Sequence, residues 1–160
     1  DGRIAELKSM TWPPERGVTK LPRLGSHPSQ QAAFQAYSAA FSGAEFERFP
    51  RFYTEDVVLH LTSSVGDIYG REGIVEFYRP MFERVRETVI PEHLEVGDER
   101  IVYDAISRFT AVKDAPDFVV GPLKVGEWYD VPVRVEYTLR GGLICDIHVT
   151  RRGERSFGSA

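Results

Sequence analysis

Residues 128–152 read WYDVPVRVEYTLRGGLICDIHVTRR and predict two β-strands joined by a tight turn. Apolar and polar side chains alternate over 128–139, as they do in a strand with one buried face. The Arg-Gly-Gly that follows is a hairpin signal, because glycine adopts the backbone angles of tight turns at little cost. A last strand is predicted over 143–152. Another long strand is predicted over 100–113, so this half of the chain favours an antiparallel meander.

The region before the meander has helical spacing. Phe34, Tyr37 and Phe41 recur at intervals of three or four residues, which predicts one buried helical face. Two more short helices are predicted, one over 46–53 and one from residue 71 into the low eighties. A proline within each of these two segments predicts that the helix is bent or short.

The whole pattern predicts an α+β protein. A strand over 57–62 lies among the helices, and the spacing changes from helical to alternating near Ile90. Three N-terminal helices should therefore cover one face of a curved mixed or antiparallel sheet. We expect an N-terminal arm over 1–28, one domain over 29–153 and a flexible tail over 154–160.

Composition excludes several classes of function. The net charge of −4 argues against nucleic acid as a partner, because phosphate binding needs clustered lysine and arginine. Cys145 is the only cysteine, so neither an internal disulfide nor a cysteine zinc cage is expected. No apolar run approaches the roughly 18 residues of a membrane span, and no secretory signal opens the sequence. The default expectation is a cytoplasmic protein that does not bind membranes.

Three stretches are similar to a known family. IYGREGIVEFY at 68–78 resembles a loop and helix start of the ketosteroid isomerase and SnoaL-like polyketide cyclase group, within the nuclear transport factor 2-like superfamily. FYTEDV at 52–57 and LRGGLI at 139–144 resemble two further segments of that group. The resemblance covers about residues 30–152 and implies the family's cone-shaped fold, in which a curved sheet wraps over a pocket.

The resemblance places three tyrosines at functional positions. Tyr37 matches the residue that donates a hydrogen bond to the substrate oxyanion, and Tyr53 and Tyr78 match the two phenols that support it. A buried chain of phenols would polarise each hydrogen bond in turn. The alternative is that each tyrosine is a core aromatic with its hydroxyl at the surface or on a backbone carbonyl.

The family's aspartates are absent. Leu61 matches the general base, Val135 matches the protonated aspartate of the oxyanion hole, and Val149 matches the acid/base residue of the cyclases. Apolar side chains cannot move a proton, so isomerase or cyclase activity does not follow from the resemblance. These three residues are expected to make the pocket more apolar.

Two other residues are candidates for proton transfer. His60 adjoins Leu61, and an ordinary imidazole pKa near 6.5 suits a general base. Strand neighbours point to opposite faces, however, so His60 should face away from the pocket if Leu61 faces it. Asp104 lies in an apolar strand and is either an acid or a member of an ion pair. Arg108, Arg134 and Glu136 could equally pair across the two long strands on an outer face. The histidines lack the short spacing of metal-ligand pairs, so no metal site is predicted.

The leading hypothesis is a cofactor-independent enzyme that acts by acid/base chemistry on a small, largely apolar carbonyl or enolisable compound. Isomerisation, cyclisation, dehydration and hydrolysis all stay open. Tyr37 would donate to the oxyanion, and His60 or Asp104 would accept the proton. The alternatives are a non-catalytic module that binds a small apolar ligand, and an assembly scaffold whose pocket is filled. A homodimer through the outer sheet face is also expected, because the long strands carry more β-branched and aromatic residues than one buried face needs.

Overall fold

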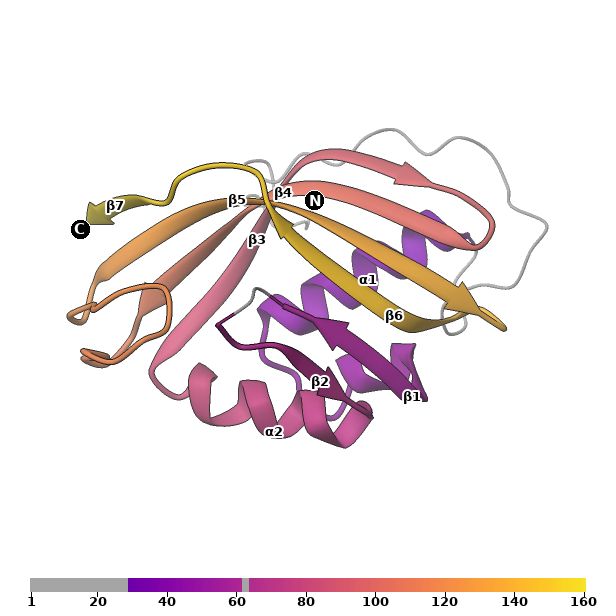
Figure 1. The fold of residues 1–160 in the computed structure, drawn as a ribbon, viewed down its shortest axis with the longest axis horizontal. Coiled ribbons are helices and arrows are strands. Elements are labelled where there is room, and N and C mark those ends of the chain that lie inside the picture. Colours follow the sequence, from indigo (N-terminus) through magenta and orange to yellow (C-terminus); the bar gives the residue numbers. More distant parts are fainter. Residues whose placement is uncertain (1–28, 62–63) are drawn as a thin grey trace, which may run out of the picture.

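The chain folds into a curved mixed sheet with helices on one side (Figure 1), in a computed structural model that describes residues 29–61 and 64–160. The predicted N-terminal arm lies outside the described residues. Within them, no helix is long and apolar enough to cross a membrane. The strands are β1 (Tyr53–His60), β2 (Asp67–Tyr69), β3 (Val85–Val96), β4 (Arg100–Ala111), β5 (Glu127–Arg140), β6 (Leu143–Arg151) and β7 (Ser156–Ser159).

The sheet has seven strands, in the order β2-β1-β6-β5-β4-β3, with β7 beside β5. Strands β3 to β6 form the predicted antiparallel meander. Strand β1 pairs with β6 in parallel, with His60 opposite His148, so the sheet is mixed. Figure 1 shows the long strands bending over the helices. The α+β class and the curved mixed sheet are confirmed.

The helices are α1 (Gln30–Ser42) and α2 (Arg71–Phe82), with a single 3₁₀ turn, η2 (Phe49–Phe52), between them. Helix α1 begins where the Ser29 hydroxyl accepts a hydrogen bond from the Ala32 amide at 3.1 Å, as an N-cap does. The second predicted helix is only this 3₁₀ turn. Pro50 occupies its first turn, and the backbone is already extended at Tyr53.

Two strands begin earlier than predicted, and part of the predicted tail is a strand. Strand β1 begins at Tyr53 rather than at residue 57. The alternation of buried and exposed side chains is interrupted at Glu55 and Asp56, which are both exposed, and the register to β6 shifts between Tyr53 and Val58. Strand β3 begins at Val85 rather than near residue 90. The tail predicted to be flexible includes β7, which pairs with the part of β5 that β6 leaves uncovered.

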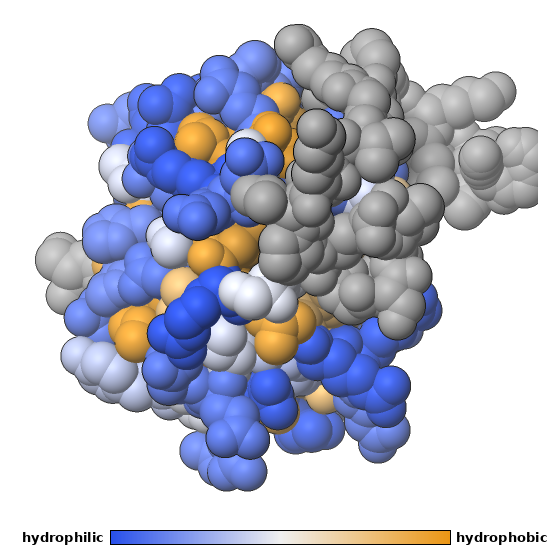
Figure 2. Space-filling model, turned by 90° about the vertical axis from the view of Figure 1, so that its right-hand side faces the viewer, coloured by the Kyte–Doolittle hydropathy of each residue, from blue (hydrophilic) through white to orange (hydrophobic). Residues whose placement is uncertain are grey.

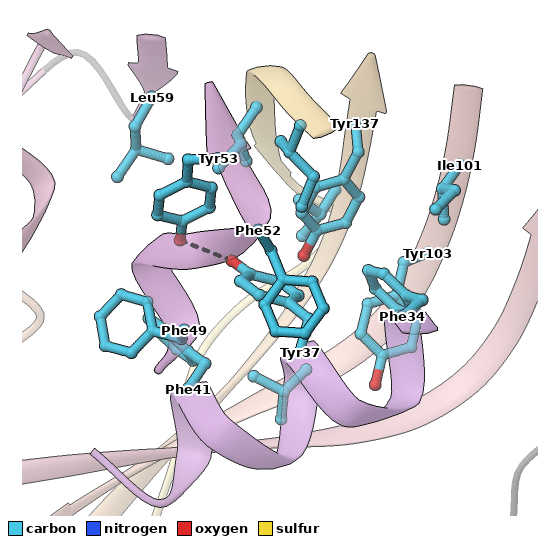
Figure 3. Packing of buried hydrophobic residues seen from close by; sticks show 14 of the residues in the cluster. Phe34, Tyr37, Phe41, Phe49, Phe52, Tyr53, Leu59, Ile101, Tyr103 and Tyr137 are labelled. Carbon is cyan, nitrogen blue, oxygen red and sulfur yellow. Dashed lines mark hydrogen bonds between the residues drawn. The ribbon is translucent and has the colours of Figure 1, made fainter. Parts of the chain in front are cut away.

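Aromatic rings fill the space between α1 and the sheet (Figure 3). Phe34 meets Tyr103 and Tyr137 edge-to-face, with ring centroids 5.1 Å and 5.0 Å apart. Phe41 meets the rings of Phe49 and other residues in the same manner. Each such pair adds about 0.5–1.5 kcal/mol to the stabilisation from burial alone. On the described part of the face in Figure 2, apolar residues appear as patches among hydrophilic ones.

Candidate functional site

A cavity of about 230 Å³ lies between the helices and the inner face of the sheet. It is smaller than the roughly 300–1,000 Å³ of typical ligand sites, so it suits a small ligand. Most of its lining is apolar. The apolar residues that line it include Leu59, Leu61, Val89, Val133, Val135 and Val149.

Two phenols meet at the cavity wall. The hydroxyl oxygens of Tyr37 and Tyr53 are 2.7 Å apart, and either one can be the donor (Figure 3). Their side chains are nearly closed to solvent, with relative exposures of 5% and 1%. Burial raises the pKa of both phenols well above the ordinary value, so both carry a proton near neutrality. Since one proton joins the two oxygens, the other proton remains for a ligand in the cavity.

Other tyrosines surround this pair. Tyr78 lines the same cavity, but the described part of the chain shows no hydrogen bond between Tyr78 and either phenol of the pair. Tyr137 lies against Tyr37 on the side away from Tyr53 (Figure 3), with ring centroids 6.0 Å apart. Tyr103 also lines the cavity. Sequence reasoning missed Tyr103 and Tyr137, although both occupy inward positions of predicted strands.

Glu87 is the carboxylate of the cavity. It lies on β3 between Val85 and Val89, and all three side chains are buried because alternate strand residues share a face. Burial raises the pKa of Glu87 from 4.5 to about 7, and a hydrogen bond with Ser107 offsets part of that rise. Glu87 is the one acidic side chain among the described residues that line the cavity. Near neutral pH it exists in both charge states, as a group that accepts and returns protons must.

The raised pKa of Glu87 predicts a pH dependence of stability. The unfolded chain releases this proton near pH 4.5 and the folded chain near pH 7, so the folded state holds more protons between these values. The free energy of unfolding should therefore fall as pH rises through this window, by at most about 1.4 kcal/mol per pH unit from this one group. Urea unfolding at pH 5 and pH 8 should show that Glu87→Gln removes part of this fall. Glu92→Gln, at an exposed position of the same strand and paired with an arginine that stays charged, should leave it unchanged.

His60 does not belong to the cavity, which corrects its candidacy as the pocket base. Leu59 and Leu61 line the cavity, so the side chain between them points to the outer face of the sheet. There its Nε2 lies 2.8 Å from Asp146 and its Nδ1 lies 3.0 Å from Asp67. This geometry fits the other prediction, in which Leu61 lines the pocket and His60 faces away from it.

Asp104 is likewise on the outer face, which corrects its candidacy as a proton acceptor in the pocket. Its neighbours Tyr103 and Ala105 are buried inside. Arg134 donates two hydrogen bonds to its carboxylate, from Nε at 2.8 Å and from an Nη at 2.9 Å. These bonds lower the pKa of Asp104, so it stays ionised. The ion-pair interpretation of Asp104 fits, and the acid interpretation does not.

The positions that match the family's aspartates all lie at the cavity. Leu61, Val135 and Val149 contribute to its wall, so the wall is apolar where the resemblance implies carboxylates. The carboxylate of this cavity, Glu87, therefore comes from β3 and from none of these three positions. Sequence reasoning missed Glu87, and the signal that identifies it is a glutamate in phase with Val85 and Val89.

The described residues contain one cluster suited to a metal ion, and it lies away from the cavity. His60, Asp146 and His148 place ligand atoms within 4.8 Å of one another on the outer face of the sheet. The cavity itself offers one carboxylate among phenols and apolar groups, which favours proton transfer over metal binding.

Comparisons of sequence and of structure with known proteins point to the same family. A sequence profile described as the SnoaL-like domain matches residues 34–147. A comparison with curated proteins found no match. A proposed polyketide cyclase from Pseudomonas putida is 18% identical and has a TM-score of 0.63, over 74% of this chain and 88% of its own.

Two more solved structures show the same architecture. A proposed SnoaL-like polyketide cyclase from Shewanella putrefaciens is 15% identical and has a TM-score of 0.66, over 79% of this chain and 91% of its own. A computationally designed 17-OHP binder is 16% identical and has a TM-score of 0.62, over 80% of this chain and 95% of its own. At such identities the likeness is one of fold, and the site has to be argued from its own residues.

Proposed function

This chain belongs to the SnoaL-like domain family, and we propose that it is a cofactor-independent enzyme of the cyclase or isomerase kind. Its substrate is a small, largely apolar carbonyl or enolisable compound. The observation that carries the proposal is a buried carboxylate, Glu87, in the same small cavity as the hydrogen-bonded phenols of Tyr37 and Tyr53. Enolisation needs a base for the proton and a hydrogen-bond donor for the developing oxyanion, and this cavity holds both kinds of group.

The division of roles follows from the charge state of each group. Ionised Glu87 removes a proton from the carbon beside the substrate carbonyl, and the electrons of that C–H bond move to the carbonyl oxygen. The phenol pair donates a hydrogen bond to this oxygen as it becomes negative. Glu87 then returns the proton to carbon, to the same atom or to another one. No external oxidant or reductant is required.

Hydrogen exchange in heavy water tests this proposal without knowledge of the natural product. Enolisation replaces the hydrogens beside a carbonyl with deuterium, which proton NMR follows directly. We expect the protein to accelerate exchange in some members of a panel of small cyclic ketones, relative to buffer and to an unrelated protein. If members of the panel bind in the cavity and none exchanges faster than in buffer, the enzymatic proposal fails.

The alternative is a non-catalytic module that binds a small molecule in the same cavity. The apolar wall at Leu61, Val135 and Val149 favours it, because a site built for binding alone needs no carboxylate there. The two proposals differ in one respect. A binding module should bind ligands equally well with Glu87 or glutamine at position 87 and should accelerate exchange in neither form.

The homodimer and the cytoplasmic location stay predictions. The outer face of β4 and β5 carries ion pairs such as Asp104–Arg134 and Arg108–Asp130, together with half-buried apolar residues such as Ile106. An isologous contact of this mixed character is typical of dimers. Light scattering at micromolar concentration should give twice the 18.1 kDa mass of one chain. A mass of one chain across that range would contradict the dimer.

A further inference from the structure

Four side chains suited to metal coordination lie together on the outer face of the sheet. They come from three adjacent strands, β2, β1 and β6, in the order that Figure 1 shows. His60 on β1 is the register partner of both Asp67 on β2 and His148 on β6. Asp146 precedes His148 by two residues and therefore points to the same face. Chain segments far apart in the sequence thus converge on one spot.

The contacts centre on His60. Its Nδ1 lies 3.0 Å from an oxygen of Asp67, and its Nε2 lies 2.8 Å from an oxygen of Asp146. The ring of His148 stacks on the His60 ring, with centroids 4.5 Å apart. A nitrogen of His148 is 4.0 Å from the other carboxylate oxygen of Asp146.

A neutral imidazole cannot donate a hydrogen bond to both of these carboxylates. Such a ring has one N–H, so only one of its two carboxylate contacts is a hydrogen bond and the other sets a lone pair against a negative oxygen. If Asp67 accepts the hydrogen bond from Nδ1, the Nε2 lone pair points toward Asp146. Protonation of the ring lets it donate to both carboxylates, and a metal ion between Nε2 and Asp146 relieves the same repulsion when the ring is neutral. A carboxylate that fixes the tautomer of a ligating histidine through its second nitrogen is a recurring feature of zinc sites.

We propose that His60, Asp146 and His148 bind a divalent transition-metal ion of the zinc class, with Asp67 orienting His60. Imidazole and carboxylate together suit zinc, nickel or copper better than magnesium or calcium, which prefer oxygen ligands alone. Three protein ligands leave a fourth position for water.

Small side-chain movements complete the geometry. Tetrahedral ligands at about 2.0–2.1 Å from zinc are roughly 3.3 Å from one another. The 2.8 Å separation of His60 and Asp146 must widen, and the 4.0 Å separation of Asp146 and His148 must close. All three side chains are partly exposed, and the stacked rings of His60 and His148 must turn so that both nitrogens point at the ion. The ion would then tie β1 to β6, on the face of the sheet opposite the cavity and independently of the proposed reaction.

Zinc titration of the full chain tests the site, after metal is stripped with a chelator and any purification tag is removed. Isothermal titration calorimetry should show one zinc ion bound per chain. Binding to the folded state alone should also raise the Tm with zinc concentration. The informative variants are His148→Ala, which removes a ligand, and Asp67→Asn, which removes the orienting charge.

His93→Ala is the matched control. The side chains of His93 and His148 are both 57% exposed, and His93 also contacts a carboxylate, that of Glu95 at 3.0 Å, but no second histidine adjoins it in the described structure. Zinc affinity should fall by at least about tenfold in His148→Ala and by about tenfold in Asp67→Asn. It should be unchanged in His93→Ala.

Three results would overturn the site: no stoichiometric zinc binding by the unmodified chain, wild-type affinity in His148→Ala, or an equal loss in His93→Ala. Hydrogen exchange into ketones should be the same in His148→Ala as in the unmodified chain. The two proposals can therefore fail separately.

Discussion

Glu87→Gln is expected to lower the rate of deuterium exchange into a responsive ketone by about 10²- to 10⁴-fold, the range attributed to a positioned acid or base. Glutamine has nearly the same volume and keeps a hydrogen-bonding group toward Ser107, but it cannot accept a proton at any accessible pH. Removing a buried charge should not harm the fold. The rate in the unmodified protein should rise with pH through about 7, where Glu87 becomes ionised, and then level off.

Glu95→Gln provides the control for charge, since it changes an exposed glutamate of the same strand. It should leave both the rate and its pH dependence unaltered. If Glu87→Gln exchanges as fast as the unmodified protein, or if the pH dependence persists in it, another group is the proton acceptor.

Tyr37→Phe is expected to lower the same rate by about 10²- to 10³-fold, because it deletes a hydroxyl that donates to the developing oxyanion or supports the one that does. The ring and its packing against Phe34 and Tyr137 remain. Loss of one buried hydrogen bond costs about 1 kcal/mol, which corresponds to a Tm shift of roughly 2–4 °C for a chain of this size. Activity should therefore fall far more than stability.

Comparison with Tyr53→Phe identifies the donor, since the larger loss marks the phenol whose proton reaches the substrate. Tyr129→Phe is the control, because the Tyr129 hydroxyl donates to the backbone oxygen of Pro122 in a separate apolar cluster. An equal loss in Tyr129→Phe, or no loss at Tyr37, would remove the phenol pair from the mechanism.

Most of the fold could be predicted because its signals are local. The stripe through Phe34, Tyr37 and Phe41 and the alternation over residues 128–139 each report one buried face, and each became the expected element. Short strands were not predicted, because they give no local signal. Strand β2 has three residues and β7 has four, too few for a period to appear, and their pairing depends on partners elsewhere in the chain.

The site could be predicted only in part, because a pocket collects residues from distant segments. Tyr37 and Tyr53 were identified through the resemblance, and the cavity does bring them together. Glu87 was missed because the expected strand began near residue 90, after the glutamate. His60 and Asp104 were proposed for their chemistry, although strand alternation had already argued for the outer face. The direction of a side chain should have outweighed its type.

The parallel pairing of β1 with β6 means that the sheet cannot be completed until β6 has been synthesised. His60 and Asp146, which meet across this pairing, are 86 positions apart in the sequence. The hairpins of the meander join neighbouring segments and close quickly, whereas a contact over this distance waits for the intervening chain and is slow to find. Synthesis runs from the N-terminus, so the aromatic face of α1 leaves the ribosome long before the strands that cover it. The cavity is therefore assembled last, and a nascent chain that stops before β6 exposes its aromatic residues to chaperones and to other chains.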